Sequence, residues 1–368
     1  MARPEENIAL VLQGGGALGA YQGGAAECIL GCGIGLHWVA GISIGAINSA
    51  ILAGSAPEDR VRNLRRFWER VSSRSIPAYL LDGVLPRGFL NHLSASATSI
   101  AGVPGFFDLR VPPAGMMPPG TSGASSYYDT APLRETLEEL VDFDRINHGD
   151  VRLSVGAVNV ETGNMTWFDS EDMTIGPEHI MASGALPPGF PAVEIDGAFF
   201  WDGGIVTNTP LHYVLDERMP HENLCVFQVD LFSARGAIPD SVWDAPERMK
   251  DIRFSSRTRF NTDMMRRMHQ TSAAARRLYR KLPPELRDDP DARLLGAHND
   301  EPRITIAHLI YRQRRYEHHS KDYEFSRWSM EEHWRAGHHD AETTVKHPDW
   351  RGRMDAESMI QVFDLAGK

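Results

Sequence analysis

Two strand–glycine–helix units near the start of the chain constrain its fold more than any other feature. Residues 8–12 form an apolar run that ends in three glycines, and a helical pattern begins near residue 20. The segment 36–42 has the pattern of a second strand, followed by a sharp turn and a helix that stops at Gly54, a residue type typical of helix C-termini. This alternation predicts parallel strands covered by helices, which is an α/β fold.

Strand and helix patterns continue to about residue 232 and then change. The central segments are, in order, a helix over 131–141, two strands within 151–170, a short helix near 179–184, a hairpin over 193–204 and a buried strand over 223–232. Asp196–Gly197 in the hairpin suits a type I′ turn. Beyond residue 236, Arg, His, Glu and Trp dominate and strand signals fade. We therefore expect an α/β domain over residues 1–235 and a mostly helical C-terminal region over 236–368.

The segment 77–127 interrupts this pattern. It is dense in Gly, Pro and Ser, yet it also carries Phe106, Phe107, Met116 and Met117. A long irregular segment inside a compact domain is usually a lid, a binding loop or disordered. Disordered linkers seldom hold so many large apolar residues, so the sequence favours a lid over disorder for residues 102–123.

Composition limits the class of protein and its location. Hydrophobic residues make up 42% of the 368 residues and charged residues 24%, enough for a globular chain with a sizeable core. The formal net charge of −11 argues against nucleic acid as the main partner. Three cysteines indicate a reducing compartment without a disulfide framework. No targeting segment and no run of about 20 apolar residues is present, so we predict a cytoplasmic protein and leave open its peripheral attachment to a membrane.

The glycine turn after the first strand allows two interpretations. Gly14, Gly16 and Gly19 spell G-x-G-x-x-G, which in this context can hold the pyrophosphate of a dinucleotide. A dinucleotide site also needs an acid about 20 residues further on, at the end of the second strand. The chain has no acid there, and Ser43 follows instead. The alternative is an oxyanion site, formed by the backbone amides of the turn.

The sequence GISIG, residues 41–45, has the pattern of a nucleophile elbow. Ser43 must occupy a tight turn so that its hydroxyl points into a cleft, and glycine at positions 41 and 45 avoids steric collision. Adjacent parallel strands bring their C-terminal ends together, so the amides of Gly14, Gly15 and Gly16 should lie beside Ser43. On this motif alone, an ordinary glycine-bounded turn remains the alternative.

A serine nucleophile needs a base, and the usual base is histidine. The chain has 15 histidines, but His37, His212 and His221 lack a comparable signal and are interpreted as surface or packing residues. Asp202 is the better candidate, because three aromatic residues lead to it and Gly203 and Gly204 follow it. Taken alone, it could equally be a turn former.

Three motifs taken together resemble one family. GGGALG (14–19), GISIG (41–45) and DGG (202–204), with ASGALPPGFPAV (182–193) before the last, are similar to the patatin-like phospholipase family over about residues 7–235. The resemblance implies a three-layer α/β/α sandwich with a mostly parallel sheet. It also implies a Ser43–Asp202 dyad without histidine and an oxyanion hole at Gly14–Gly16. The implied activity is hydrolysis of lipid esters, without metal or cofactor. Many members carry Arg or Lys where this chain has Leu18.

Other functions and partners remain open at this level. The alternatives are a carboxylesterase or thioesterase for soluble acyl compounds, a dinucleotide-binding protein and a catalytically silent scaffold. Residues 250–281 hold ten Arg or Lys and two Asp, a local net charge of +8. This composition suits either a packed helix with a solvated basic face or a helix that contacts an anionic membrane. Nucleic acid is a weaker alternative partner. Histidines near 333–339 suit a solvated helix face better than a metal site. The sequence does not define the oligomeric state.

Overall fold

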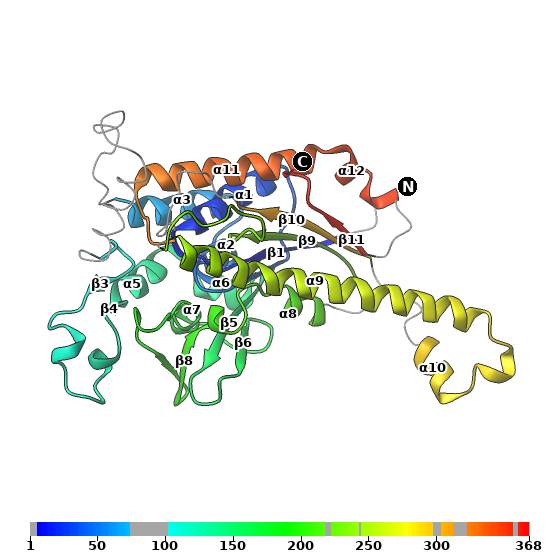
Figure 1. The fold of residues 1–368 in the computed structure, drawn as a ribbon, viewed down its shortest axis with the longest axis horizontal. Helices are drawn as coiled ribbons and strands as arrows, with labels where there is room; N and C mark the ends of the chain where they lie inside the picture. Colours follow the sequence, from blue (N-terminus) through cyan, green and yellow to red (C-terminus); the bar gives the residue numbers. More distant parts are fainter. Residues whose placement is uncertain are drawn as a thin grey trace.

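The computed structural model describes residues 6–73, 102–217, 222–242, 244–296, 303–312, 322–355 and 360–367. Within these residues, a nine-stranded sheet lies at the centre, and helices cover both of its faces (Figure 1). Its strands are β1 (Glu6–Leu12), β2 (Trp38–Gly41), β5 (Arg152–Asn159), β6 (Met165–Asp169), β7 (Val193–Ile195), β8 (Ala198–Asp202), β9 (Asn223–Asp230), β10 (Ile304–Ile310) and β11 (Ile360–Phe363). The strand order is β11–β10–β9–β1–β2–β5–β8–β7, and β6 also pairs with β5.

The sheet is mostly parallel. All neighbouring pairs from β11 to β5 are parallel, whereas β6, β7 and β8 are added in antiparallel pairs. The register places Leu12, the last residue of β1, opposite Gly41 of β2. The glycine turn and the elbow therefore leave the same edge of the sheet side by side, as the sequence predicts.

Helices pack on both faces because residues of β1 alternate between two cores. Leu10 and Leu12 belong to the larger core, together with residues of α1, α2, α3 and α11, whereas Ala9 and Val11 belong to a smaller core under α8. The helices are α1 (Ala20–Gly31), α2 (Ile44–Ala53), α3 (Arg60–Val71), α5 (Ala131–Leu140), α6 (Phe143–His148), α7 (Pro177–Ser183), α8 (Leu211–Asp216), α9 (Ala245–Arg280), α10 (Pro290–Gly296), α11 (Arg327–Lys346) and α12 (Pro348–Arg351). This arrangement confirms the predicted three-layer α/β/α architecture.

The C-terminal region is mostly helical, as predicted, but it also contributes two strands that were not predicted. β10 pairs with β9, and β11 pairs with β10, so strands from both sides of residue 235 share one sheet. The apolar run ITIAHLI of β10 is typical of a buried strand and is the signal that could have revealed it. The boundary at residue 235 stays a prediction.

Two long helices of the C-terminal region contact the body differently. α11 packs along α1, and a Cβ at Gly24 or at Gly337 would overlap backbone of the facing helix, so the two helices approach closely. α9 begins against the body, and its second half extends away from it (Figure 1). None of the helices in the described ranges is both long enough and apolar enough to cross a bilayer.

The described part of the irregular segment, residues 102–127, has defined structure. Phe106 and Phe107 are buried. The chain then leaves the body through β3 (Asp108–Leu109) and returns through β4 (Tyr128–Asp129), which pairs with β3. We call residues 108–129 the excursion. Residues 77–101 lie outside the described residues. Whether residues 102–123 act as a lid stays a prediction.

Candidate active site

Ser43 lies at a strained turn between β2 and α2. Its φ of 56° and ψ of −124° are unfavourable for a residue with a side chain, and such strain is concentrated at functional sites. A Cβ at Gly41 would overlap the carbonyl of Gly45, and one at Gly45 would overlap the carbonyl of Leu12. Only glycine fits at either position, so the GISIG motif has the steric role that its sequence predicts.

A second serine, Ser183, holds the elbow through hydrogen bonds. The Ser43 amide donates a hydrogen bond to Ser183 Oγ at 3.0 Å, and the Ser183 hydroxyl donates to the carbonyl of Gly156 at 2.7 Å. Ser183 is fully buried at the end of α7. It thereby joins the turn to β5. The sequence reasoning missed Ser183, although it lies in the ASGALPP segment that was noted.

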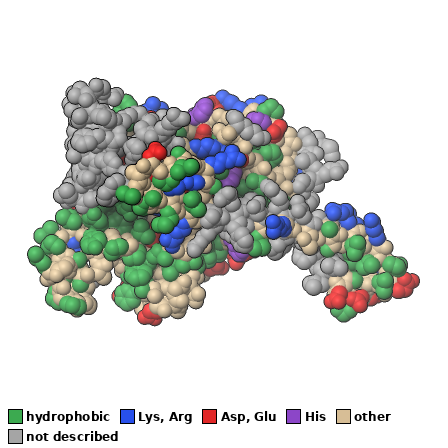
Figure 2. Space-filling view, in the orientation of Figure 1, with side chains coloured by type: hydrophobic (Ala, Val, Ile, Leu, Met, Phe, Trp, Pro, Cys, Tyr) green, Lys and Arg blue, Asp and Glu red, His purple; other side chains and the backbone are tan. Residues whose placement is uncertain are grey.

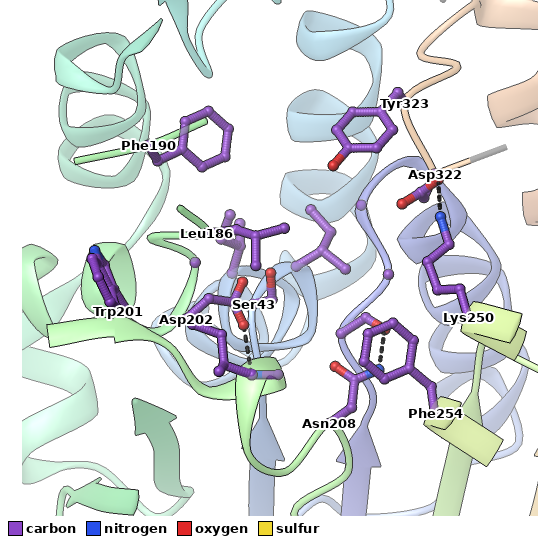
Figure 3. Close-up of a pocket in the computed structure, with 18 of the residues that line it drawn as sticks. Ser43, Leu186, Phe190, Trp201, Asp202, Asn208, Lys250, Phe254, Asp322 and Tyr323 are labelled. Carbon is purple, nitrogen blue, oxygen red and sulfur yellow. Dashed lines mark hydrogen bonds and ion pairs between the residues drawn. The ribbon is translucent and has the colours of Figure 1, made fainter. Parts of the chain in front are cut away.

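Asp202 ends β8 and faces Ser43 (Figure 3). Its side chain is buried, and its Oδ1 accepts a hydrogen bond from the Gly204 amide at 2.6 Å. Burial raises the pKa of this carboxyl to about 6, although hydrogen bonds from the Ser43 side chain and the Gly204 amide oppose the rise. The structure therefore brings together the two residues that the sequence singled out. A Cβ at Gly203 would lie 2.5 Å from the carbonyl of Gly156, so the turn after Asp202 also needs glycine.

The glycine turn after β1 contacts the same site. The Gly14 amide donates to the Asn208 carbonyl at 3.1 Å, and Asn208 Nδ2 donates to the Gly14 carbonyl at 2.9 Å. Within the described part of the chain, no acceptor is present for the amides of Gly15 and Gly16. These two amides are therefore available to a ligand. Gly19 has a packing role instead, because a Cβ there would lie 2.6 Å from Ile44 Cγ1.

Ser43, Asp202 and the glycine turn share one cavity of about 450 Å³. Its wall is mainly apolar and includes the side chains of Ile44, Ile47, Phe106, Phe107, Leu186, Phe190, Trp201, Phe232 and Phe325. No histidine of the described ranges lines it. His212 lies on α8 and pairs with Asp216, and His37 accepts from the Ile8 amide at the start of β1. His221 lies outside the described residues.

Residues of the C-terminal region form part of this wall, which the sequence did not predict. Lys250, Arg253 and Phe254 come from α9, and Asp322, Tyr323 and Phe325 come from the segment before α11 (Figure 3). Lys250 Nζ lies 2.8 Å from Asp322 Oδ1 and 3.0 Å from Glu247 Oε2. Burial lowers the pKa of Lys250, but the two carboxylates outweigh this effect and raise it, so the lysine stays charged.

Asp322 also contacts the glycine turn directly. Its carbonyl accepts a hydrogen bond from the Ala17 amide at 2.8 Å. Gly16 has a φ of 54°, and a Cβ there would overlap the Asp322 carbonyl. Asp322 therefore packs against the turn and takes up one of its amides, that of Ala17, which a dinucleotide pyrophosphate would otherwise compete for.

Elsewhere in the described chain, no three His, Cys, Asp or Glu side chains come together as a metal site. The prediction of a solvated helix face is wrong for His333, which is buried beside Tyr311 with ring centroids 5.2 Å apart, whereas His339 on the same helix is exposed. In the basic segment 250–281, Lys250 is paired at the cavity, whereas Arg267 and Arg277 on the second half of α9 are exposed.

Comparisons with known proteins agree with the motifs. A family model described as patatin-like phospholipase matches residues 10–215, which is 206 (215 − 10 + 1) of the 368 residues. A second model, described as patatin phospholipase, matches residues 252–357. A search of curated protein sequences returned no match.

Solved structures give more distant likenesses. VipD from Legionella pneumophila is 14% identical with a TM-score of 0.37, covering 92% of this chain and 66% of VipD. ExoU in its heterodimeric complex with SpcU, from the type III secretion system of Pseudomonas aeruginosa, is 17% identical with a TM-score of 0.31, covering 62% of this chain and 44% of that one. The chain thus spans less than two thirds of the length of either protein.

Proposed function

The chain belongs to the patatin-like phospholipase family, and from that premise we propose that it is a serine acyl hydrolase of lipid esters. Ser43 is the nucleophile and Asp202 is the base. One observation carries the proposal: a serine at a strained elbow faces a buried aspartate within a largely apolar cavity.

The first step forms an acyl-enzyme. Asp202 takes the hydroxyl proton of Ser43 while Oγ attacks the ester carbonyl carbon, and the carbonyl oxygen becomes an oxyanion. The alcohol then leaves with the proton held by Asp202. Since the pKa of Asp202 is raised to about 6, the group is mostly ionised at neutral pH and is more basic than an ordinary carboxylate.

The second step reverses these roles. Water loses a proton to Asp202 and attacks the acyl carbon, and the collapse of the second oxyanion returns the proton to Ser43 Oγ. Both oxyanions lie beside the glycine turn. Gly15 and Gly16 are the proposed donors, and removal of one such donor typically costs about 3–4 kcal/mol of transition-state stabilisation. Gly14, the third predicted donor, would first have to release the Asn208 carbonyl.

The cavity also bears on the alternatives. Its aromatic and aliphatic wall suits an acyl chain, which supports a lipid ester over a small soluble ester or thioester. The dinucleotide alternative has less support, because the Asp322 carbonyl accepts from the Ala17 amide beside the glycine turn and the second strand ends without an acid. A silent scaffold would not use a reactive serine, and labelling tests this directly.

Contact of residues 250–281 with an anionic membrane is a separate proposal. Exposed Arg267, Arg277, Arg280 and Lys281 support it, since each basic residue near an anionic surface contributes about 1 kcal/mol. Reversal of Arg267 and Arg277 to Glu should weaken binding to phosphatidylglycerol vesicles, with a strong dependence on salt. Equal binding of wild type and variant would contradict it.

The central experiment is labelling with a fluorophosphonate probe, followed by hydrolysis assays. Ser43→Ala should abolish labelling and turnover, whereas Ser73→Ala, at an exposed turn, should change neither. Wild-type activity is then compared on phospholipids, a short soluble ester and a thioester. Undiminished labelling of Ser43→Ala would overturn the nucleophile, and activity confined to the short substrates would favour the esterase alternative.

A further inference from the structure

Large apolar side chains are exposed on the excursion and on the two segments next to it. We define the apolar rim as Leu109, Val111, Met116, Tyr127, Leu186 and Phe199. Val111 is 86% exposed and Met116 is 77% exposed. Figure 2 shows hydrophobic side chains gathered over β3 and β4 and, beside them, over β8. Grouped exposure of this kind marks an interaction surface, whereas scattered exposed residues do not.

In the excursion, the charged side chain of Arg110 turns inward and apolar side chains face solvent, the reverse of an ordinary surface loop. Arg110 is the one charged residue between positions 109 and 127. Its guanidinium turns inward, where it donates to Ser126 Oγ at 3.2 Å and to the Tyr128 carbonyl at 3.1 Å, and its side chain is only 15% exposed. Its neighbours Leu109 and Val111 face solvent instead. The loop thus covers its charge and presents its apolar groups.

The rim is continuous with the mouth of the cavity. Leu186 belongs to both, because it lines the cavity and is 39% exposed. Backbone hydrogen bonds from Tyr127 to Pro188 at 3.1 Å and from Tyr128 to Gly189 at 2.9 Å join the excursion to the segment that holds Leu186. Two further rim residues are near cavity-lining residues in the sequence. Leu109 comes two residues after Phe107, and Phe199 comes two residues before Trp201.

We propose that the apolar rim docks on a lipid bilayer and that substrate passes from the bilayer directly into the cavity. The proposal rests on the proposed function, which requires a lipid ester to reach Ser43. Charge attraction cannot supply this contact, because the whole chain has a net charge of −11 and the rim presents no cation. Docking through the rim therefore depends on burial of apolar side chains, works on zwitterionic lipid and is insensitive to salt.

The test is co-sedimentation with phosphatidylcholine vesicles at low and high salt. The variant is Val111→Ser with Met116→Ser, and the control is Leu286→Ser. Leu286 is 53% exposed and lies beyond the far end of α9, outside residues 250–281 (Figure 1). Loss of each rim side chain should weaken binding about tenfold, or about 100-fold for the pair, at either salt concentration. The control should bind like the wild type.

A short soluble ester separates docking from chemistry. The rim variant should hydrolyse it within about twofold of the wild-type rate, because neither substituted residue lines the cavity. Ser43→Ala should bind vesicles like the wild type, so binding by the rim remains measurable even if the chain hydrolyses no ester. The proposal is overturned if the rim variant binds phosphatidylcholine normally. It is also overturned if wild type binds only anionic vesicles in a salt-sensitive way.

Discussion

Replacement of Asp202 by Asn should inactivate the protein and, at neutral pH, make it more stable. The amide keeps the volume of the carboxylate and an oxygen that can accept the Gly204 hydrogen bond, but it carries no charge. It also cannot accept the proton of Ser43. General-base catalysis typically contributes 10²–10⁴-fold, so turnover should fall by about 10³-fold.

The gain in stability follows from the raised pKa of Asp202. In the unfolded chain the carboxyl has its ordinary pKa of 3.8, and in the folded protein burial raises it to about 6. The folded state therefore holds its proton more tightly, and ionisation of Asp202 destabilises the protein as the pH rises from 3.8 to about 6. Above that window the cost is constant at about 3 kcal/mol, since each unit corresponds to about 1.36 kcal/mol. Below pH 3.8 it disappears.

The assay is thermal unfolding of wild type and Asp202→Asn at several pH values. With an unfolding entropy of about 2.1 cal/mol/K per residue, 3 kcal/mol corresponds to a rise in Tm of about 4 °C for 368 residues. The difference should be present at pH 8 and absent near pH 4. Asp240→Asn, at an exposed position, should show no such pattern. A variant that is equally stable or less stable at pH 8 would refute a buried, costly carboxylate at position 202.

Three further outcomes follow from the site. The kcat/KM of wild type on a neutral short ester should fall about tenfold from pH 7 to pH 5, because Asp202 with its pKa of about 6 is protonated over that range. With a base whose pKa is 3.8, kcat/KM would fall by less than about 10% over the same range. A flat pH profile would therefore contradict Asp202 as the base. Ser183→Ala should reduce kcat about tenfold with little change in KM, because the Ser43 amide loses its hydrogen bond to the Ser183 hydroxyl. The same change should lower the free energy of unfolding by about 1 kcal/mol. An unchanged kcat would contradict a positioning role for Ser183. Gly16→Ala should reduce kcat about 100-fold, because its Cβ displaces the Asp322 carbonyl and one oxyanion donor with it; normal turnover would exclude that turn from the site.

The parts of the site that the sequence predicts are those that depend on local sterics. Gly41 and Gly45 fit only a turn without side chains, and Ser43 between them has the φ that such a turn imposes. The type I′ turn at Asp196–Gly197 is predictable for the same reason, since both residues have positive φ, 51° and 81°. A short peptide pattern is enough for these features because the cause lies within a few residues.

The parts that the sequence did not predict depend on contacts between distant segments. Asp322 reaches the glycine turn from 306 positions away (322 − 16), and Lys250 reaches Asp322 from another element. Neither carries a local motif, because an ion pair imposes no pattern on its neighbours. Burial of Asp202 also depends on the assembled fold. β10 is different, since its apolar run gave a local signal that charged surroundings concealed.

The contact of Asp322 with Gly16 has a consequence for the time during synthesis at which the cavity is completed. Ser43 and Asp202 leave the ribosome before the segment that closes the cavity beside them. At about 5–20 residues per second, the 123 residues from 202 to 325 (325 − 202) take about 6–25 s to synthesise. During that interval the nascent chain holds Ser43 and Asp202 but lacks Asp322, Tyr323 and Phe325 of the cavity wall. The cavity is therefore completed late in synthesis, and under the proposed function the full substrate site exists only after residue 325 has been added.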